Sequence, residues 1–147
     1  MQHTFFKLWI HLVWSTKGRE PFLLNRNRKD IFFHIKETGE EKGFHLDVIN
    51  GTKNHVHCLL SLNPKWSISE IANQLKGESS HWINEQNLMK PKFFWQRGFG
   101  AFSVSQSNVQ RIRNYILNQE EHHRKISFKE EWQILLKKHN IVIDKRT

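Results

Sequence analysis

Two histidines set two residues apart are the first residues whose spacing indicates chemistry. His55 and His57 belong to the run HVHCLLSL, residues 55–62, which has the pattern of a β-strand. Alternation along a strand puts both imidazoles on one face, roughly 6.5–7 Å apart along the chain, where they can converge on one metal ion. Cys58 points to the other face, so a His-His-Cys cluster is not expected. Taken alone, so short a pattern is more typical of two exposed or hydrogen-bonded histidines.

Tyr115 and Gln119 form a second pair, in a segment with helical periodicity at about residues 108–124. Residues four apart are neighbours on a helix surface, so a phenol and a carboxamide lie side by side there. If this helix docks on the sheet face that carries the histidines, its hydroxyl and amide oxygen approach the two imidazoles. Tyr115 is also the only tyrosine in the chain. The alternative is a boundary tyrosine that packs its ring and hydrogen-bonds its hydroxyl to solvent.

Together these four side chains have the chemistry of phosphodiester cleavage. A phenolate can attack a phosphodiester and form a covalent phosphotyrosine. A divalent ion held by two imidazoles and an amide oxygen would polarise the phosphate and stabilise the leaving 3′-oxygen. Such a site is neutral and incomplete, so it leaves coordination positions for a DNA phosphate. Imidazole suits Zn²⁺, whereas an oxygen-rich completed shell also suits Mg²⁺ or Mn²⁺.

The strands that must position the histidines follow period-two patterns. Strands are predicted at residues 5–14, 44–49 and 55–62, and the aromatic, glycine-broken stretch 93–105 is predicted to form a short hairpin or a bulged strand pair. In the first strand His11 falls on one face, and the other face is apolar and consists of Phe6, Leu8, Ile10, Leu12 and Trp14. The pair Asn50-Gly51 predicts the turn between the second and third strands.

Apolar periodicity and capping sequences mark the helices. Helices are predicted at about residues 26–42, 68–86, 108–124 and from 128 onward. The last three are preceded by capping-box pairs, namely Ser67 with Glu70, Ser107 with Gln110, and Ser127 with Glu130. The tail IVID, residues 141–144, is expected to add a short extended piece. The order β-α-β-β-α-β predicts an α+β fold with a ferredoxin-like split βαβ antiparallel sheet, an added tyrosine-bearing helix and a C-terminal helix, in a single domain over residues 1–147.

The composition indicates a nucleic-acid partner. Lys and Arg total 23 against 14 Asp and Glu, a formal net charge of +9, and six Trp and eleven Phe accompany that charge. Positive charge displaces counterions from phosphates, and aromatic faces stack on unpaired bases. The alternative is a basic protein without such a partner. One cysteine excludes an internal disulfide and a cysteine-rich zinc motif, and neither a signal peptide nor a run of ~18 apolar residues is found, so a reducing cytosol is expected.

With these residues in place, the sequence resembles the single-tyrosine HUH transposases of the insertion-sequence 200/605 type. The resemblance rests on HVH at 55–57, on Tyr-Ile-Leu-Asn-Gln at 115–119, and on the order of the stretches HLVWSTKGREP, INGTKNHVHCLLSL, SISEIANQLKGESSHWINE, FWQRGFGAFSVS and NQEEHHRKISFKEEW. It covers about residues 3–143. Two positions depart from the family pattern, because Asn54 stands where an acidic residue is frequent and Phe99 where an aromatic hydroxyl is frequent.

The resemblance implies a metal-dependent endonuclease and strand transferase that acts on single-stranded DNA. His55, His57 and Gln119 would bind Mg²⁺ or Mn²⁺. Tyr115 would attack the scissile phosphate, take a 5′-phosphotyrosine link and release a free 3′-hydroxyl. Similar proteins are homodimers that recognise hairpins near element ends, and their tyrosine helix can serve the partner's metal site, so a composite active site is implied. A cytoplasmic, nucleoid-associated protein of bacterial type is expected.

Six basic residues are candidates for DNA contacts: Lys17, Arg19, Lys53, Lys76, Arg97 and Arg111. A solvated surface charge is the simpler explanation for each one separately, except where Lys53 and Arg111 adjoin the candidate site. Trp95 and Phe99 could stack on bases or pack in the core. His122 and His123 could support the site or contact DNA, and the sequence assigns them no role.

Two other functions are compatible with the same sequence. A related enzyme that cuts and rejoins host repeat hairpins would use identical chemistry, so only genomic context or a substrate screen separates it from a transposase. A non-catalytic nucleic-acid-binding protein could also use this sheet. A binding protein has no need of two histidines, a tyrosine and a glutamine in this arrangement, and their joint presence argues against it.

Overall fold

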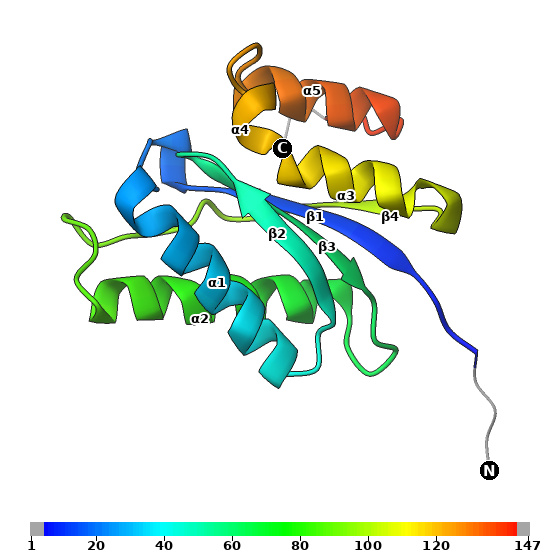
Figure 1. The fold of residues 1–147 in the computed structure, drawn as a ribbon, viewed down its shortest axis with the longest axis horizontal. Coiled ribbons are helices and arrows are strands. Elements are labelled where there is room, and N and C mark those ends of the chain that lie inside the picture. Colours follow the sequence, from blue (N-terminus) through cyan, green and yellow to red (C-terminus); the bar gives the residue numbers. More distant parts are fainter. Residues whose placement is uncertain (1–4, 144–147) are drawn as a thin grey trace.

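The structure is a computed structural model, and it describes residues 5–143. Its centre is a four-stranded antiparallel sheet with the strand order β2-β3-β1-β4 (Figure 1). The strands are β1 (Trp9–Ser15), β2 (Leu46–Gly51), β3 (His55–Ser61) and β4 (Gly100–Val104). The helices are η1 (Lys17–Arg19), α1 (Asn25–Glu41), α2 (Ile68–Glu85), η2 (Gln106–Asn108), α3 (Val109–Leu117), α4 (Gln119–His122) and α5 (Phe128–Lys138). The predicted ferredoxin-like α+β fold is confirmed.

One face of the sheet packs against α1 and α2 and forms the main hydrophobic core. Alternate side chains of β1 and β3 point into it, among them Leu12 and Val56. The helices contribute their apolar stripes, for example Ile35 from α1 and Leu75 from α2. Cys58 lies in this core, as strand alternation predicts, and burial raises the pKa of its thiol. This face is therefore built for stability.

The opposite face carries polar side chains and is covered by α3, α4 and α5 (Figure 1). His11, His55 and His57 lie on this face, and all three are buried. Apolar contacts flank them on both sides, since Val13 packs with residues of α5 and Leu59 packs with residues of α3. These two small clusters fix the helices over the histidines.

The first strand begins later than predicted. β1 starts at Trp9, because its ladder partners in the neighbouring strands are Ser61 and Val104, the last residues of β3 and β4. Phe6 and Leu8 were expected on the apolar face, but they precede the strand and are 40% and 50% exposed. The rest of the predicted alternation holds within the strand.

The hairpin predicted at residues 93–105 is wrong. Only β4 is a strand, and the segment before it meets the sheet through one isolated bridge between Thr16 and Trp95. Trp95 is buried, and its indole N–H donates to Ser79 Oγ at 2.9 Å. The aromatic residues at the start of this stretch include Phe93 and Trp95, which are buried in the main core. Core packing rather than strand pairing therefore holds this segment in place.

The turn before the first histidine also differs from the prediction. Gly51 belongs to β2, and the chain reverses over Thr52–Asn54, with the Thr52 N–H donating to the His55 carbonyl at 3.1 Å. A Cβ at Gly51 would clash with that same carbonyl oxygen. Glycine is required there by the close approach of the two strands rather than by a turn.

The segment that carries the tyrosine is two helices instead of one at 108–124. Asn118, with φ −100° and ψ 20°, separates α3 from α4. The capping box of Ser107 with Gln110 is wrong, because the 3-10 turn η2 occupies that position and α3 has no side-chain cap. The capping boxes that begin α2 and α5 are confirmed.

The C-terminal tail forms no strand where it can be described. Residues 141–143 of the run IVID belong to no strand and form no isolated β-bridge. Asp144 lies outside the described residues. Within residues 5–143, no helix combines the length and apolar character needed to cross a membrane.

Candidate active site

β3 presents His55 and His57 with their Nε2 atoms directed at a common centre. Each Nδ1 atom is held by a neighbour on the outer side. His55 Nδ1 lies 2.8 Å from Asn54 Oδ1 and 3.0 Å from Thr52 Oγ1. His57 Nδ1 lies 2.7 Å from His11 Nε2. Outer hydrogen bonds of this kind fix the orientation of metal-binding imidazoles, so the strand and its turn preorganise both rings.

Gln119 reaches the same centre from α4. It is fully buried, and its Oε1 lies 3.0 Å from His55 Nε2. Its Nε2 donates to Glu131 Oε2 at 3.0 Å, which fixes the amide with its oxygen toward the histidine. The structure thus brings together the two histidines and the glutamine. His55 and Gln119 are 64 residues apart in the chain.

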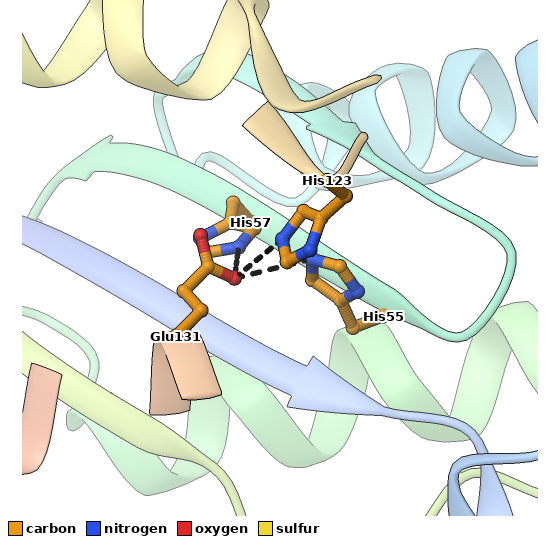
Figure 2. A group of neighbouring side chains, drawn as sticks. All are labelled: His55, His57, His123 and Glu131. Carbon is orange, nitrogen blue, oxygen red and sulfur yellow. Dashed lines mark hydrogen bonds and ion pairs between the residues drawn. The ribbon is translucent and has the colours of Figure 1, made fainter. Parts of the chain in front are cut away.

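Glu131, on α5, lies at the middle of the cluster and was not among the predicted residues. It is 1% exposed, and Figure 2 shows dashed lines from one oxygen of its carboxylate to His57, His55 and His123. Its Oε1 lies 3.0 Å from His57 Nε2, 2.9 Å from His123 Nε2 and 3.3 Å from His55 Nε2. One nitrogen or oxygen atom from each of these four side chains falls within 4.8 Å of all the others.

Tyr115 reaches the cluster from α3. Its hydroxyl donates to Glu131 Oε2, and His122 Nε2 lies 3.5 Å from the same hydroxyl. The tyrosine ring meets the His57 ring edge-on, with 5.9 Å between centroids. The half-buried ring also lines a mostly apolar cavity of about 230 Å³ between β4, α3 and α5, which Arg111 borders as well. The sole tyrosine therefore lies between the buried cluster and a cavity large enough for a ligand.

Burial governs the titrating groups of the site. It lowers the pKa of His55 to about 4, so this imidazole is neutral at physiological pH. Burial, together with the charge of Glu131, raises the pKa of Tyr115 above its usual value. Burial alone would raise the pKa of Glu131, but hydrogen bonds from His123, His55 and His57 outweigh it and hold that pKa below the usual range. The centre of the cluster is thus an ionised carboxylate.

The donor set fits a divalent cation. A neutral imidazole has one proton, yet both nitrogens of His55 face oxygen acceptors, Nδ1 facing Asn54 Oδ1 and Nε2 facing Gln119 Oε1. If the proton is on Nδ1, the Nε2 lone pair confronts oxygen lone pairs. A divalent cation between them removes that conflict, since imidazole nitrogens and amide and carboxylate oxygens are all metal ligands in proteins.

The predicted DNA-contact residues fall into different surroundings. Lys17 and Arg19 in η1 are exposed, as is Lys53 in the turn that precedes His55. Arg97 and Arg19 line a groove at one end of the sheet, beside Phe99, Phe128 and Trp132.

Two of those predictions have a more specific setting. Arg111 is exposed at the cavity beside Tyr115. The ammonium of Lys76 instead donates to the carbonyls of Gln96 and Gly98, at 2.8 and 2.7 Å. Lys76 therefore ties α2 to the segment before β4, which leaves less of its charge for a phosphate.

Sequence reasoning missed Glu131 and gave no role to His123. A signal for Glu131 does exist, since it lies three residues after Phe128 and four before Leu135, both buried on the apolar stripe of α5. A carboxylate inside an apolar stripe is rarely left unpaired. His123 Nδ1 donates to the Ile126 carbonyl at 2.8 Å, an interaction set by the α4–α5 connection that no spacing rule predicts.

Comparison with known proteins places the chain among transposases. Residues 4–119 match the family described as Transposase IS200 like. The chain is 29% identical over 124 residues to the transposase for insertion sequence element IS200 of Salmonella typhimurium strain LT2, with 81% of each chain covered. It is 24% identical over 119 residues to the ISDra2 transposase TnpA of Deinococcus radiodurans, covering 78% of this chain and 85% of that one.

Two solved structures share the fold. A candidate transposase from Deinococcus radiodurans R1 has a TM-score of 0.65 at 24% identity, covering 81% of this chain and 95% of that one. A REP-associated tyrosine transposase solved with a REP hairpin has a TM-score of 0.54 at 16% identity, covering 79% and 67%. The family match ends at Gln119, so His123 and Glu131 lie beyond it.

Proposed function

The chain belongs to the IS200-like transposase family, and from that premise we propose that it cleaves and rejoins single-stranded DNA through a 5′-phosphotyrosine intermediate. The observation that carries the proposal is the meeting of Tyr115 with His55, His57 and Gln119 in one buried cluster. These residues come from β3, α3 and α4 of a single chain. A merely structural core would have no need to bury so many polar groups around the only phenol.

In the proposed reaction Tyr115 is the nucleophile. Its phenol oxygen forms a bond to the scissile phosphorus, and the bond from phosphorus to the 3′-oxygen breaks. The proton lost by the phenol balances the proton gained by the released 3′-hydroxyl. Attack by a 3′-hydroxyl on the phosphotyrosine reverses the same steps and rejoins the strands. The energy of the phosphodiester is kept in the protein–DNA link, so rejoining needs no added energy source.

The proposed ligands of the metal ion are His55, His57 and Gln119. When bound, a divalent ion such as Mg²⁺ or Mn²⁺ supplies polarisation of the phosphate and stabilisation of the leaving oxygen. The protein's part is to orient the ligands, through Asn54 and His11 on the outer nitrogens of the two imidazoles. Asn54 stands at the position where an acidic residue was expected, and its amide oxygen makes the contact that a carboxylate would make.

The proposed substrate is single-stranded DNA with hairpins. The net charge of +9 favours a polyanion, and one structural neighbour was solved with a REP hairpin. Arg111 at the Tyr115 cavity, Lys53 in the turn before His55, and Arg19 with Arg97 at the groove are proposed as phosphate contacts. Lys17 and Lys76 stay predictions of lesser weight, the latter because its ammonium already has two carbonyl partners.

The proposed unit of catalysis is the single domain of one chain. Tyr115 contacts His57 and Glu131 of the same chain, so the arrangement needs no residue from a partner. The expected homodimer with composite sites stays a prediction, as do the cytoplasmic location and nucleoid association. Mixing a Tyr115→Phe chain with a His57→Leu chain tests the composite site, because cleavage is restored only if the tyrosine of one chain can serve the histidines of another.

The test of the function is the formation of a covalent protein–DNA adduct. Purified protein is incubated with hairpin-containing single-stranded DNA and Mn²⁺ or Mg²⁺, and products are separated on a denaturing gel. We expect a shifted protein–DNA band that a chelator abolishes. Tyr115→Phe should abolish the band while retaining DNA affinity, because only the attacking oxygen is removed. An adduct formed by Tyr115→Phe would overturn the assignment of the nucleophile.

A substrate screen addresses the alternatives. If host repeat hairpins are cleaved and element-end hairpins are not, the protein is the related repeat-processing enzyme. If every hairpin is bound with steep salt dependence and none is cleaved, the protein is a non-catalytic binder.

A further inference from the structure

Glu131 is a buried carboxylate that lies outside the matched family region, which ends twelve residues earlier at Gln119. It is 1% exposed and sits between Phe128 and Leu135 on the stripe that packs α5 against the sheet. Burying a carboxylate costs several kcal/mol unless hydrogen bonds or a cation compensate it. An apolar residue would serve packing better there, so the carboxylate needs another explanation.

The two oxygens of Glu131 face different halves of the site. Oε1 faces the imidazoles, with His57 Nε2 at 3.0 Å and His55 Nε2 at 3.3 Å. These are the nitrogens that the outer hydrogen bonds turn toward the common centre. Oε1 is therefore placed among the atoms that would surround an ion.

Oε2 faces the nucleophile instead. It accepts from the Tyr115 hydroxyl, and it accepts from Gln119 Nε2 at 3.0 Å. The amide contact keeps Gln119 Oε1 turned toward His55. One carboxylate thus touches the proposed nucleophile with one oxygen and the proposed ion ligands with the other.

Charge favours a ligand role for Glu131. Imidazole and amide ligands bring no negative charge to a divalent ion, whereas Mg²⁺ and Mn²⁺ sites usually include a carboxylate. Within residues 5–143, the cluster at this centre contains three histidines and one carboxylate, that of Glu131. The site is incomplete without it.

We propose that Glu131 is a further metal ligand through Oε1 and that it positions Tyr115 through Oε2. This inference rests on the proposed metal-dependent function and deepens it. Helix α5 then belongs to the active site, because its docking sets the distance between the nucleophile and the ion. The competing account is that Glu131 occupies the place of the ion, in which case its removal would tighten metal binding.

The first test measures Mn²⁺ affinity of the full chain without DNA, by electron paramagnetic resonance of free Mn²⁺. Glu131→Gln keeps the shape and the amide contacts but removes the charge, and we expect it to weaken Mn²⁺ binding about tenfold or more. Glu130→Gln is the matched control on the next residue. Glu130 is exposed, and glutamine still serves its capping box, so wild-type affinity is expected.

The second test reads the position of the nucleophile directly. Tyrosine labelled at Cζ gives one NMR signal, because Tyr115 is the only tyrosine. Loss of the charged acceptor in Glu131→Gln should shift this signal, whereas Glu130→Gln should leave it unchanged. Glu131→Asp keeps the charge but withdraws both oxygens by one methylene. We expect it to shift the tyrosine signal while retaining more of the Mn²⁺ affinity than Glu131→Gln, and it serves if the glutamine variant does not fold.

The outcomes separate this inference from the function on which it rests. The ligand role is overturned if Glu131→Gln binds Mn²⁺ as tightly as the wild type or more tightly. If only Glu131→Asp folds, the same result with that variant overturns the ligand role. An unmoved tyrosine signal in the folded variant overturns the positioning role. His57→Leu is measured alongside, and if it too binds Mn²⁺ like the wild type, the proposed metal site itself fails. Loss of binding in His57→Leu with none in Glu131→Gln leaves the function standing and removes only Glu131.

Discussion

The two faces of the sheet differ in kind although the same strands build both. β3 sends Val56, Cys58 and Leu60 into the core beneath α1 and α2, and it sends His55 and His57 toward α3, α4 and α5. All five of these side chains are buried. The first face is sealed mainly by apolar contacts, whereas the second is sealed by a hydrogen-bonded cluster flanked by two small apolar patches.

This difference shows how a small domain separates stability from chemistry. The apolar face contains the largest of the three hydrophobic clusters, and burial of apolar side chains is the main stabilising contribution to a fold. The polar face can then hold groups that stabilise the fold poorly, because the other side compensates for them. Substitutions on the two faces should therefore change different measurements, and three of them test the comparison.

The largest effect is expected for His57→Leu on the polar face. Leucine fills a similar volume but cannot bind an ion or orient Tyr115, so adduct formation should fall below detection. Glu131 keeps its contacts with His123, Gln119 and Tyr115, whereas buried His11 loses its partner, so the midpoint of thermal unfolding should fall by less than in a truncation of the main core. The gel assay and a melting curve measure the two quantities. A large loss of thermal stability would mean that the polar face also carries the fold.

A large effect of the opposite kind is expected for Leu60→Ala on the apolar face. Leu60 is 2% exposed in the main core, and such a truncation typically costs about 2–5 kcal/mol of unfolding free energy. Mn²⁺ affinity of the folded variant should equal that of the wild type. Denaturant unfolding gives the first quantity and metal titration the second. Loss of metal affinity comparable to that of His57→Leu would break the separation of the two faces.

The smallest effect is expected for Arg111→Ala, at the outer edge of the polar face. Removing one phosphate contact should lower the slope of the logarithm of DNA affinity against the logarithm of salt concentration by about 0.7 for a single strand. Lys29→Ala on α1, an exposed cation over the other face, is the matched control and should leave the slope unchanged. Equal slopes for both variants would remove Arg111 from the proposed DNA path.

The sequence predicted the fold and the geometry of β3 well, because both depend on local periodicity. Strand alternation alone placed His55 and His57 together and sent Cys58 to the other side. The spacing of Tyr115 and Gln119 likewise brought them near one another, although Asn118 interrupts the helix that was expected to carry both.

What the sequence did not predict depends on tertiary docking. The apolar stripe of α5 was recognised, but the surface it would meet was not, so Glu131 could not be assigned to the histidines. The same holds for the aromatic stretch before β4, where burial of Trp95 replaced the expected hairpin. Local sequence patterns predict which face of a helix or strand is buried. Which other element packs against that face is decided only when the whole chain folds.

The central claim, that Tyr115 is the nucleophile of this polar face, is tested most directly by locating the DNA attachment. Wild-type protein is reacted with hairpin-containing single-stranded DNA and Mn²⁺, the adduct is digested, and mass spectrometry identifies the peptide that carries the nucleotide. The account predicts a 5′-phosphate ester on Tyr115 alone. An ester on any other residue, or cleaved DNA with no covalently modified peptide, would contradict it.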